Sequence, residues 1–285
     1  MNEQNEQNEQ SEQLARIRWQ FTRQAEAYAR MRQATDEAAF RRLITFCDAQ
    51  PEHAVLDVAC GPAFMTLVFA AHCRAVTGFD ATDRFLALAR AEAARRGLAN
   101  VQFDLGDAEH LPYPDGSFDR VLCRAALHHL LHPARVLAEM KRVLRPAGRM
   151  LVLDMLTADD DGRAAYHNRI ERLCDPTHTR ALAAREFDAL YRDCDLQLLA
   201  RTRQTIDYHS VDEWLEHGDP WPAAASAIVA LMEASLNRDR CGLNVRREDG
   251  RLRFSHTVVA DVPQACVPAE NPVQAGVLRH VPMAG

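Results

Sequence analysis

Apolar residues follow a helical spacing near the start of the chain and a different pattern further along. One face of a first predicted helix carries Leu14, Ile17, Phe21, Ala25 and Tyr28. A second helix is predicted over residues 37–48. Beyond residue 50, short apolar runs predict strands over residues 54–60, 75–79, 101–105, 118–123 and 149–155. The segments between these runs predict helices over residues 64–72, 84–96 and 134–144.

Strands that alternate with helices of this length are typical of an α/β fold with a doubly wound, mostly parallel sheet. Beyond residue 155 the pattern changes, and helices over 162–173 and 184–191 are followed by strands over 196–208 and 252–260. A terminal antiparallel pair that closes the sheet is the simplest arrangement of these two strands. Ligands of such sheets bind beyond the carboxyl ends of the strands, so we expect the helical insertion at 209–240 to lie near a bound ligand.

The pattern divides the chain into three zones. Residues 1–13 repeat Asn, Glu and Gln, and we expect a disordered tail there. Residues 14–261 carry the periodic structure of one domain, in which 14–48 form lid helices. Residues 262–285 contain four prolines and little periodicity, and are expected to be a flexible tail.

Composition excludes several classes of function. The 285 residues include 34 Lys and Arg and 40 Asp and Glu, for a formal net charge of −6. Nucleic acids and anionic membranes need a basic footprint, so neither is an expected partner. No apolar run reaches the roughly 18 residues of a membrane-spanning helix, and the first residues resemble no targeting peptide, which favours a cytoplasmic protein.

None of the eight cysteines forms a C-x-x-C pair, so no metal site is expected.

The clearest chemistry lies in a turn of small residues after the first strand, where residues 57–63 read DVACGPA. Such a turn lets a ligand approach the backbone, and the helix that follows directs free N–H groups at it. Asp80 lies 19 residues after Gly61, at the end of the second strand. A carboxylate there can accept hydrogen bonds from both hydroxyls of a ribose. Together these features indicate a cofactor that carries a nucleoside.

A dinucleotide is the weaker candidate for this cofactor. Its G-x-G-x-x-G turn would place Ala59, Gly61 and Phe64 at the three glycine positions, and Phe64 would obstruct the close packing of helix and strand. Asp57 would also lie unfavourably near a pyrophosphate. S-adenosylmethionine has no phosphate and ends in a cationic amino acid, so it suits these residues better.

Several segments match an ordered set of known motifs. Residues 57–63 resemble D-x-G-x-G-x-G, 78–82 resemble G-x-D-x-S, 106–119 resemble G-D-A…L-P-F…S-F-D, and 126–130 with 142–148 resemble A-L-H-H-L…R-V-L-K-P-G-G. These are motifs of class I S-adenosylmethionine-dependent methyltransferases, in the small-molecule branch (methyltransferase type 11) that includes ubiquinone and menaquinone C-methyltransferases. The resemblance covers about residues 18–260 and implies a Rossmann-like fold. Departures from the family's glycines are Ala59, Ala63 and Ala147.

The resemblance implies which residues bind the methionine portion of the cofactor. Asp57 and the backbone from Ala59 to Gly61 would hold it, together with the backbone at Cys123 and Arg124 after the fourth strand. We do not expect alanine at position 63 to abolish binding.

A second set of residues would bind the adenosine portion. The resemblance implies that Asp80 binds the ribose and that Ala81 packs on the adenine. Asp107 would accept a hydrogen bond from the adenine amino group, and the Ala108 amide would reach a ring nitrogen. The alternative for each aspartate is a structural role as a helix cap or turn residue. Three acids at three successive strand ends favour binding.

Catalysis and acceptor binding are less constrained. His128 and His129 follow the fourth strand, and one of them is a candidate general base; the alternative is that both pack locally. Candidate acceptor contacts are Phe21 and Tyr28 of the lid helix and Tyr166, Arg169, Asp175 and His178 further along. The alternative for the Asp175 segment is an ordinary Asp-Pro turn.

These observations predict an S-adenosylmethionine-dependent methyltransferase that transfers the methyl group directly to a small molecule. The residues around the predicted mouth suit a polar acceptor, with aromatic and heteroaromatic metabolites of secondary metabolism among the candidates. A non-catalytic S-adenosylmethionine-binding module and an NAD-dependent oxidoreductase remain alternatives. The expected partner is the small-molecule acceptor, and a homodimer is compatible with the sequence.

Overall fold

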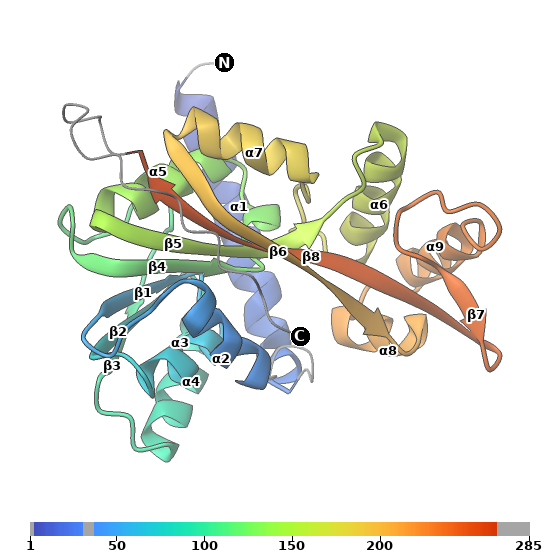
Figure 1. Cartoon of the computed structure of the whole chain (residues 1–285). Helices are drawn as coiled ribbons and strands as arrows, with labels where there is room; N and C mark the ends of the chain where they lie inside the picture. Colours follow the sequence, from blue (N-terminus) through green and yellow to red (C-terminus); the bar gives the residue numbers. More distant parts are fainter. Residues whose placement is uncertain (1–2, 31–36, 267–285) are drawn as a thin grey trace, which may run out of the picture.

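A computed structural model describes residues 3–30 and 37–266 and centres on a mixed sheet of eight strands (Figure 1). The sheet has the order β3-β2-β1-β4-β5-β8-β6, and β7 pairs with β8. The parallel strands are β1 (Ala54–Val58), β2 (Ala75–Asp80), β3 (Val101–Leu105), β4 (Phe118–Arg124) and β5 (Leu144–Leu156). The antiparallel strands are β6 (Leu196–Tyr208), β7 (Arg246–Glu248) and β8 (Arg251–Ala265). The predicted fold class is therefore confirmed, and the strand order reverses between β1 and β4.

Helices cover both faces of the sheet because each buries one apolar stripe against it. On one face lie α2 (Glu37–Phe46), α3 (Phe64–Ala70) and α4 (Asp83–Arg95). On the other lie α5 (Pro133–Val143) and α7 (Ala184–Asp193), whose residues Leu137, Met140 and Phe187 are buried with those of the sheet. This packing leaves the carboxyl ends of β1, β2 and β4 free to form a site.

The helical insertion connects the carboxyl end of β6 to the start of β8, away from the parallel part of the sheet (Figure 1). Its helices α8 (Val211–Gly218) and α9 (Pro222–Glu233) pack with α6 (Asp161–Cys174) around a separate core that includes Ile170, Trp214, Ile228, Met232 and Phe254. The first helix, α1 (Glu3–Tyr28), contacts both α8 and α4. The insertion therefore lies beside the helix that covers the strand ends.

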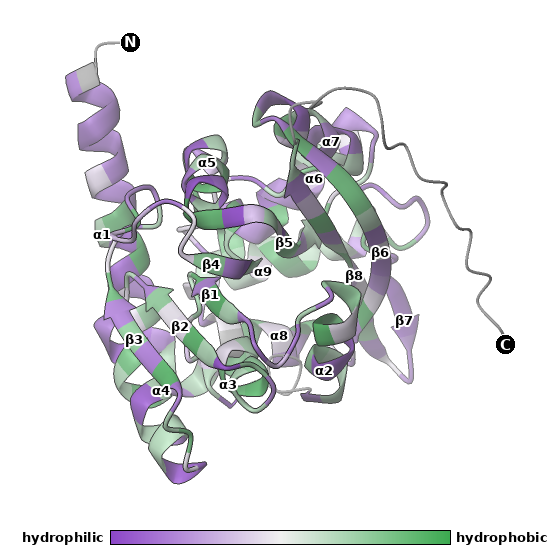
Figure 2. Cartoon of the chain, turned by 60° about the vertical axis from the view of Figure 1, so that its left-hand side comes forward, coloured by the Kyte–Doolittle hydropathy of each residue, from purple (hydrophilic) through white to green (hydrophobic). Residues whose placement is uncertain are grey.

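The N-terminal residues differ from the expected disordered tail at 1–13, because α1 already begins at Glu3. Glu and Gln are good helix formers, and tertiary contacts hold this part of the helix. Glu6 forms an ion pair with Arg135, and Gln13 donates from Nε2 to the carbonyl oxygens of His129 and Thr177. Figure 2 shows the first turns of α1 as a hydrophilic projection from the body of the protein.

The C-terminal boundary also differs, because β8 continues to Ala265 where a flexible tail was expected from residue 262. Pro263 lies opposite Leu198, beside an irregularity in the register of β6 and β8. A proline has no N–H to donate to a regular ladder, but a bulge interrupts the ladder and therefore tolerates it. The rest of the predicted tail, residues 267–285, lies outside the described residues.

Among the described residues, no helix has both the length and the apolar character to span a bilayer.

Candidate functional site

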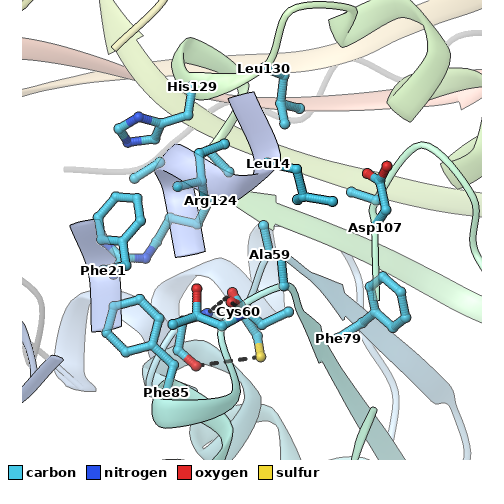
Figure 3. A pocket seen from close by; sticks show the side chains of 18 of the residues that line it. Leu14, Phe21, Ala59, Cys60, Phe79, Phe85, Asp107, Arg124, His129 and Leu130 are labelled. Atoms are coloured by element: carbon cyan, nitrogen blue, oxygen red, sulfur yellow. Dashed lines mark hydrogen bonds between the residues drawn. The ribbon is translucent and has the colours of Figure 1, made fainter. Parts of the chain in front are cut away.

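A pocket lies between α1 and the carboxyl ends of the parallel strands (Figure 3). Its walls are the turn after β1, the end of β2, the segments after β3 and β4, and one face of α1. Residues that line it include Gln10, Gln13, Leu14, Ile17, Phe21, Tyr28, Asp57, Ala59, Gly61, Asp80, Ala81, Phe85, Asp107, Ala108, Arg124, Ala125, His129 and Leu130. This is the edge of the sheet where the strand order reverses, as expected for an open α/β sheet.

The turn after β1 takes a left-handed backbone at Ala59, Gly61 and Ala63, with φ of 54°, 56° and 68°. These are the places where the methyltransferase motif prefers glycine. For alanine this conformation costs roughly 1–2 kcal/mol, and the turn nevertheless forms. The departures from the motif therefore leave the turn in place.

Asp57 and Asp80 are both buried at this turn. Asp57 accepts a hydrogen bond from the Thr66 hydroxyl at 2.6 Å, and burial raises the pKa of its carboxyl to about 6. Asp80 accepts hydrogen bonds from the backbone N–H groups of Gly61 and Thr82, both at 2.8 Å, and burial raises its pKa as well. Asp80 thereby ties the turn after β1 to the end of β2.

Asp107 completes the row of acids along the pocket. It accepts from the backbone N–H of Glu109 at 3.0 Å and from Gln10 Nε2 at 3.4 Å. Asp80 and Asp107 thus hold local turns, Asp57 holds the Thr66 side chain of α3, and all three aspartates line one common pocket. A structural role and a binding role are therefore compatible for these residues. Figure 3 places Asp107 and Phe79 at one end of the pocket and His129, Phe21 and Arg124 toward the other.

The two histidines after β4 have different surroundings. His128 is buried behind the pocket and its Nδ1 lies 2.5 Å from Asp154 Oδ1. Burial alone would lower the pKa of His128, but the Asp154 carboxylate raises it above its ordinary value. His129 lines the pocket, and burial together with His128 lowers its pKa to about 4. His129 is therefore neutral at physiological pH.

A hydrogen-bond chain fixes the tautomer of His129. Its Nδ1 lies 3.0 Å from Thr177 Oγ1, and the Thr177 hydroxyl donates to Asp175 Oδ1 at 2.7 Å. A hydroxyl has one proton, so when it donates to the carboxylate it accepts from the imidazole. Nδ1 then carries the proton, and the lone pair of Nε2 remains available as a hydrogen-bond acceptor.

Several of the predicted site residues do not line the pocket. Cys123 is buried inside β4, whereas the next two residues, Arg124 and Ala125, line the pocket. The other such residues include His128, which is buried behind the pocket wall, and Asp175, whose carboxylate accepts a hydrogen bond from the Thr177 hydroxyl.

The remaining predicted acceptor contacts lie on or just after α6. The Tyr166 hydroxyl donates to the carbonyl of Leu231 in the insertion core, and Arg169 is exposed. His178 is buried against Asn168, with its Nε2 2.7 Å from Asn168 Oδ1.

Sequence reasoning missed part of the pocket. Gln10 and Gln13 line it, although the repeated tract in which they lie predicts a disordered tail. Phe85 lies in the apolar face of α4 and would be predicted as a core residue from its spacing alone. Leu14 and Ile17 share the face of Phe21, so the apolar stripe of the first helix was the available signal for them.

Comparisons with known proteins agree with this geometry. Residues 56–152 match the model of a family described as "Methyltransferase domain". The uncharacterized methyltransferase YcgJ of Bacillus subtilis is 32% identical over 218 residues, which cover 75% of this chain and 85% of that protein. Its crystal structure superposes with a TM-score of 0.74 at 26% identity, covering 81% of this chain and 99% of that one. The ubiquinone/menaquinone biosynthesis C-methyltransferase UbiE of Ectopseudomonas mendocina is 38% identical over 118 residues, covering 40% of this chain and 46% of that protein.

Proposed function

This chain belongs to the S-adenosylmethionine-dependent methyltransferases, and we propose that the pocket beneath α1 binds the cofactor and presents its methyl group to a small polar metabolite. The observation that carries this proposal is the convergence of Asp57, Asp80 and Asp107 on one pocket. Three carboxylates suit ribose hydroxyls, an ammonium group and an adenine amino group. They would repel a pyrophosphate, which argues against a dinucleotide.

The residues at the two ends of the pocket suggest how the cofactor would be oriented in it. Asp107 and the Ala108 amide would bind the adenine, Asp80 the ribose, and Asp57 the ammonium of the methionine portion. Gln10 Nε2 occupies the oxygen of Asp107 that the adenine amino group would use, so this contact would exchange when the cofactor binds. In this orientation the methionine portion lies toward Arg124 and His129 (Figure 3).

Helix α1 would exclude water from the transfer. Phe21 packs against His129 with ring centroids 5.1 Å apart, and Tyr28 packs against Phe85 at 5.6 Å. Arg18 donates to the carbonyl of Ala81 at 3.0 Å, which fastens the helix over the end of β2. A dry, fixed site serves a reaction whose main requirement is the alignment of donor and acceptor.

When bound, S-adenosylmethionine supplies an electrophilic methyl group. The protein's part is to hold the acceptor in line and to accept a proton where the acceptor loses one. Nε2 of His129 is the candidate for that second task, because the chain through Thr177 and Asp175 leaves its lone pair free. Its pKa of about 4 suits an acceptor that is itself acidic. His128, paired with Asp154 behind the pocket wall, would help to keep His129 neutral, because it lowers the pKa of that imidazole.

Calorimetry with S-adenosylmethionine and S-adenosylhomocysteine tests the proposal. We expect dissociation constants in the low micromolar range, or roughly −8 kcal/mol. Asp80→Ala removes a charge-assisted contact with the ribose and should weaken binding by about 10- to 100-fold. The matched control is Asp83→Ala, because Asp83 is an exposed acid in the same segment.

Thermal melts give a second readout beside calorimetry. For each variant they measure how far the ligand raises the melting temperature above that variant's own unliganded value. This comparison separates lost binding from lost stability, since Asp80 also ties the turn after β1. Absence of any ligand-induced shift in folded wild-type protein would refute the proposal. An Asp80→Ala protein that binds as tightly as the Asp83→Ala control would refute the role of Asp80.

A further inference from the structure

Three side chains with metal-binding chemistry meet between α6 and β8, outside the pocket. Glu171 Oε1 lies 2.8 Å from His256 Nε2 and 3.4 Å from His167 Nε2. One ligand atom from each residue lies within 4.8 Å of the other two. His167 and Glu171 are one helical turn apart on α6 and so share a face, while β8 supplies His256 from across the interface.

The cluster is buried, with exposed fractions of 1% for His167, 6% for Glu171 and 4% for His256. A carboxylate buried between two imidazoles requires a compensating partner, because a charge in the protein interior is costly when it is unpaired.

The hydrogen bonds that the cluster makes within the protein do not satisfy all its atoms. Nε2 of His167 is completely buried and has no hydrogen-bond partner. An orphaned buried polar atom of this kind costs roughly 1–3 kcal/mol. It is directed toward the same oxygen of Glu171 that His256 approaches, so one cation between the three residues would use all three ligand atoms.

We propose that His167, Glu171 and His256 bind one divalent transition-metal ion of the zinc class. Two imidazoles and one carboxylate form a donor set that suits Zn²⁺ and its neighbours, whereas Mg²⁺ and Ca²⁺ prefer oxygen ligands alone. Three protein ligands leave a coordination position for water. Ring contacts of His256 with Tyr208 at 5.1 Å and Trp214 at 6.2 Å give the site an apolar surround, which restricts solvent access.

The ion would join α6 to β8 at the base of the insertion. The same helix and strand supply Ile170 and Phe254 to the insertion core. Metal binding would therefore stabilise the part of the fold that carries α8 and α9. None of the three ligands lines the cofactor pocket. A failed test of metal binding would therefore leave the proposed function unaffected, and a failed test of cofactor binding would leave the metal site unaffected.

Metal analysis of the full chain tests the proposal. We expect about one equivalent of zinc after purification without chelators, measured by plasma mass spectrometry. Protein stripped with a chelator should bind Co²⁺ with a dissociation constant below about 1 μM and develop a visible absorption band. Readdition of Zn²⁺ should raise its melting temperature and displace the Co²⁺ spectrum.

Variants assign the ligands. Glu171→Gln and His256→Gln should each weaken Co²⁺ binding by at least about 100-fold. His209→Gln is the matched control, because His209 is an exposed histidine on the same side of the fold, and it should bind as the wild type does. A wild-type protein that holds no metal and gives no Co²⁺ band at micromolar concentrations would overturn the proposal, whatever the variants do. A band that survives unchanged in folded Glu171→Gln and His256→Gln proteins would overturn it too.

Discussion

Asp57 makes cofactor binding depend on pH in a way that distinguishes one end of the ligand from the other. Its carboxyl has a pKa of about 6 in the free protein because it is buried. A ligand with a cationic ammonium group pairs with the ionised form, so binding such a ligand must release the proton. A ligand without the amino-acid portion has no such requirement.

The size of the effect follows from the pKa. A carboxyl with a pKa of about 6 is roughly one-tenth ionised at pH 5 and nine-tenths ionised at pH 7. The affinity for S-adenosylhomocysteine should therefore rise about tenfold between these values, or about 1.4 kcal/mol. The folding stability of the free protein depends on pH in the opposite direction from this affinity. The folded-state pKa exceeds the unfolded value of 3.8, so the stability that protonated Asp57 contributes is present below about pH 4 and is lost as the pH rises through about 6.

Calorimetry between pH 5 and pH 7 measures this, with methylthioadenosine as the comparison ligand that lacks the amino acid. Titration of Asp80 affects both ligands through the ribose, so the ratio of their affinities isolates Asp57. That ratio should rise about tenfold with pH in the wild type and stay flat in Asp57→Asn. Equal pH dependence for the two ligands in the wild type would refute the role assigned to Asp57.

Two further predictions concern catalysis and stability. Thr177→Val breaks the link between His129 and Asp175, and ¹⁵N NMR of the imidazole should show that His129 loses its preference for a proton on Nδ1; an unchanged spectrum would contradict the chain. With an acceptor in hand, kcat should fall by about 10²-fold or more. Ala147→Gly should stabilise the protein by about 0.5–1 kcal/mol, because Ala147 is exposed and has a φ of 62°. The control is Ala87→Gly, at an exposed position within α4, which should destabilise the protein by about 1 kcal/mol. Thermal or urea melts measure both variants. A loss of stability in both would show that the backbone strain at Ala147 is negligible.

The order of strands and helices could be predicted because each element carries its own periodic signal. The row of acids in the pocket could be predicted from topology, since Asp57 and Asp80 lie at the carboxyl ends of β1 and β2 and Asp107 follows β3, and these ends share one edge of the sheet. The contribution of α1 was only partly visible. Its apolar stripe was clear from Leu14 onward, but the helix before Leu14 depends on contacts such as that of Gln13 with the His129 and Thr177 carbonyls. Local composition does not encode such long-range contacts.

The histidines show the same limit. The sequence offered His128 and His129 as equals, and only the packing separates them, because His128 finds Asp154 and His129 finds Thr177. The cluster of His167, Glu171 and His256 was also out of reach of sequence reasoning, since His256 lies 85 residues beyond Glu171. No local motif spans that distance, and the spacing of the cysteines bears only on sites with thiolate ligands.

A crystal structure with S-adenosylhomocysteine tests the central claim most directly. Density should show the ribose hydroxyls on Asp80, the adenine beside Asp107, and the amino-acid end at Asp57 with the sulphur facing His129. A ligand seated elsewhere, or one that lies in this pocket with its ribose away from Asp80, would contradict it.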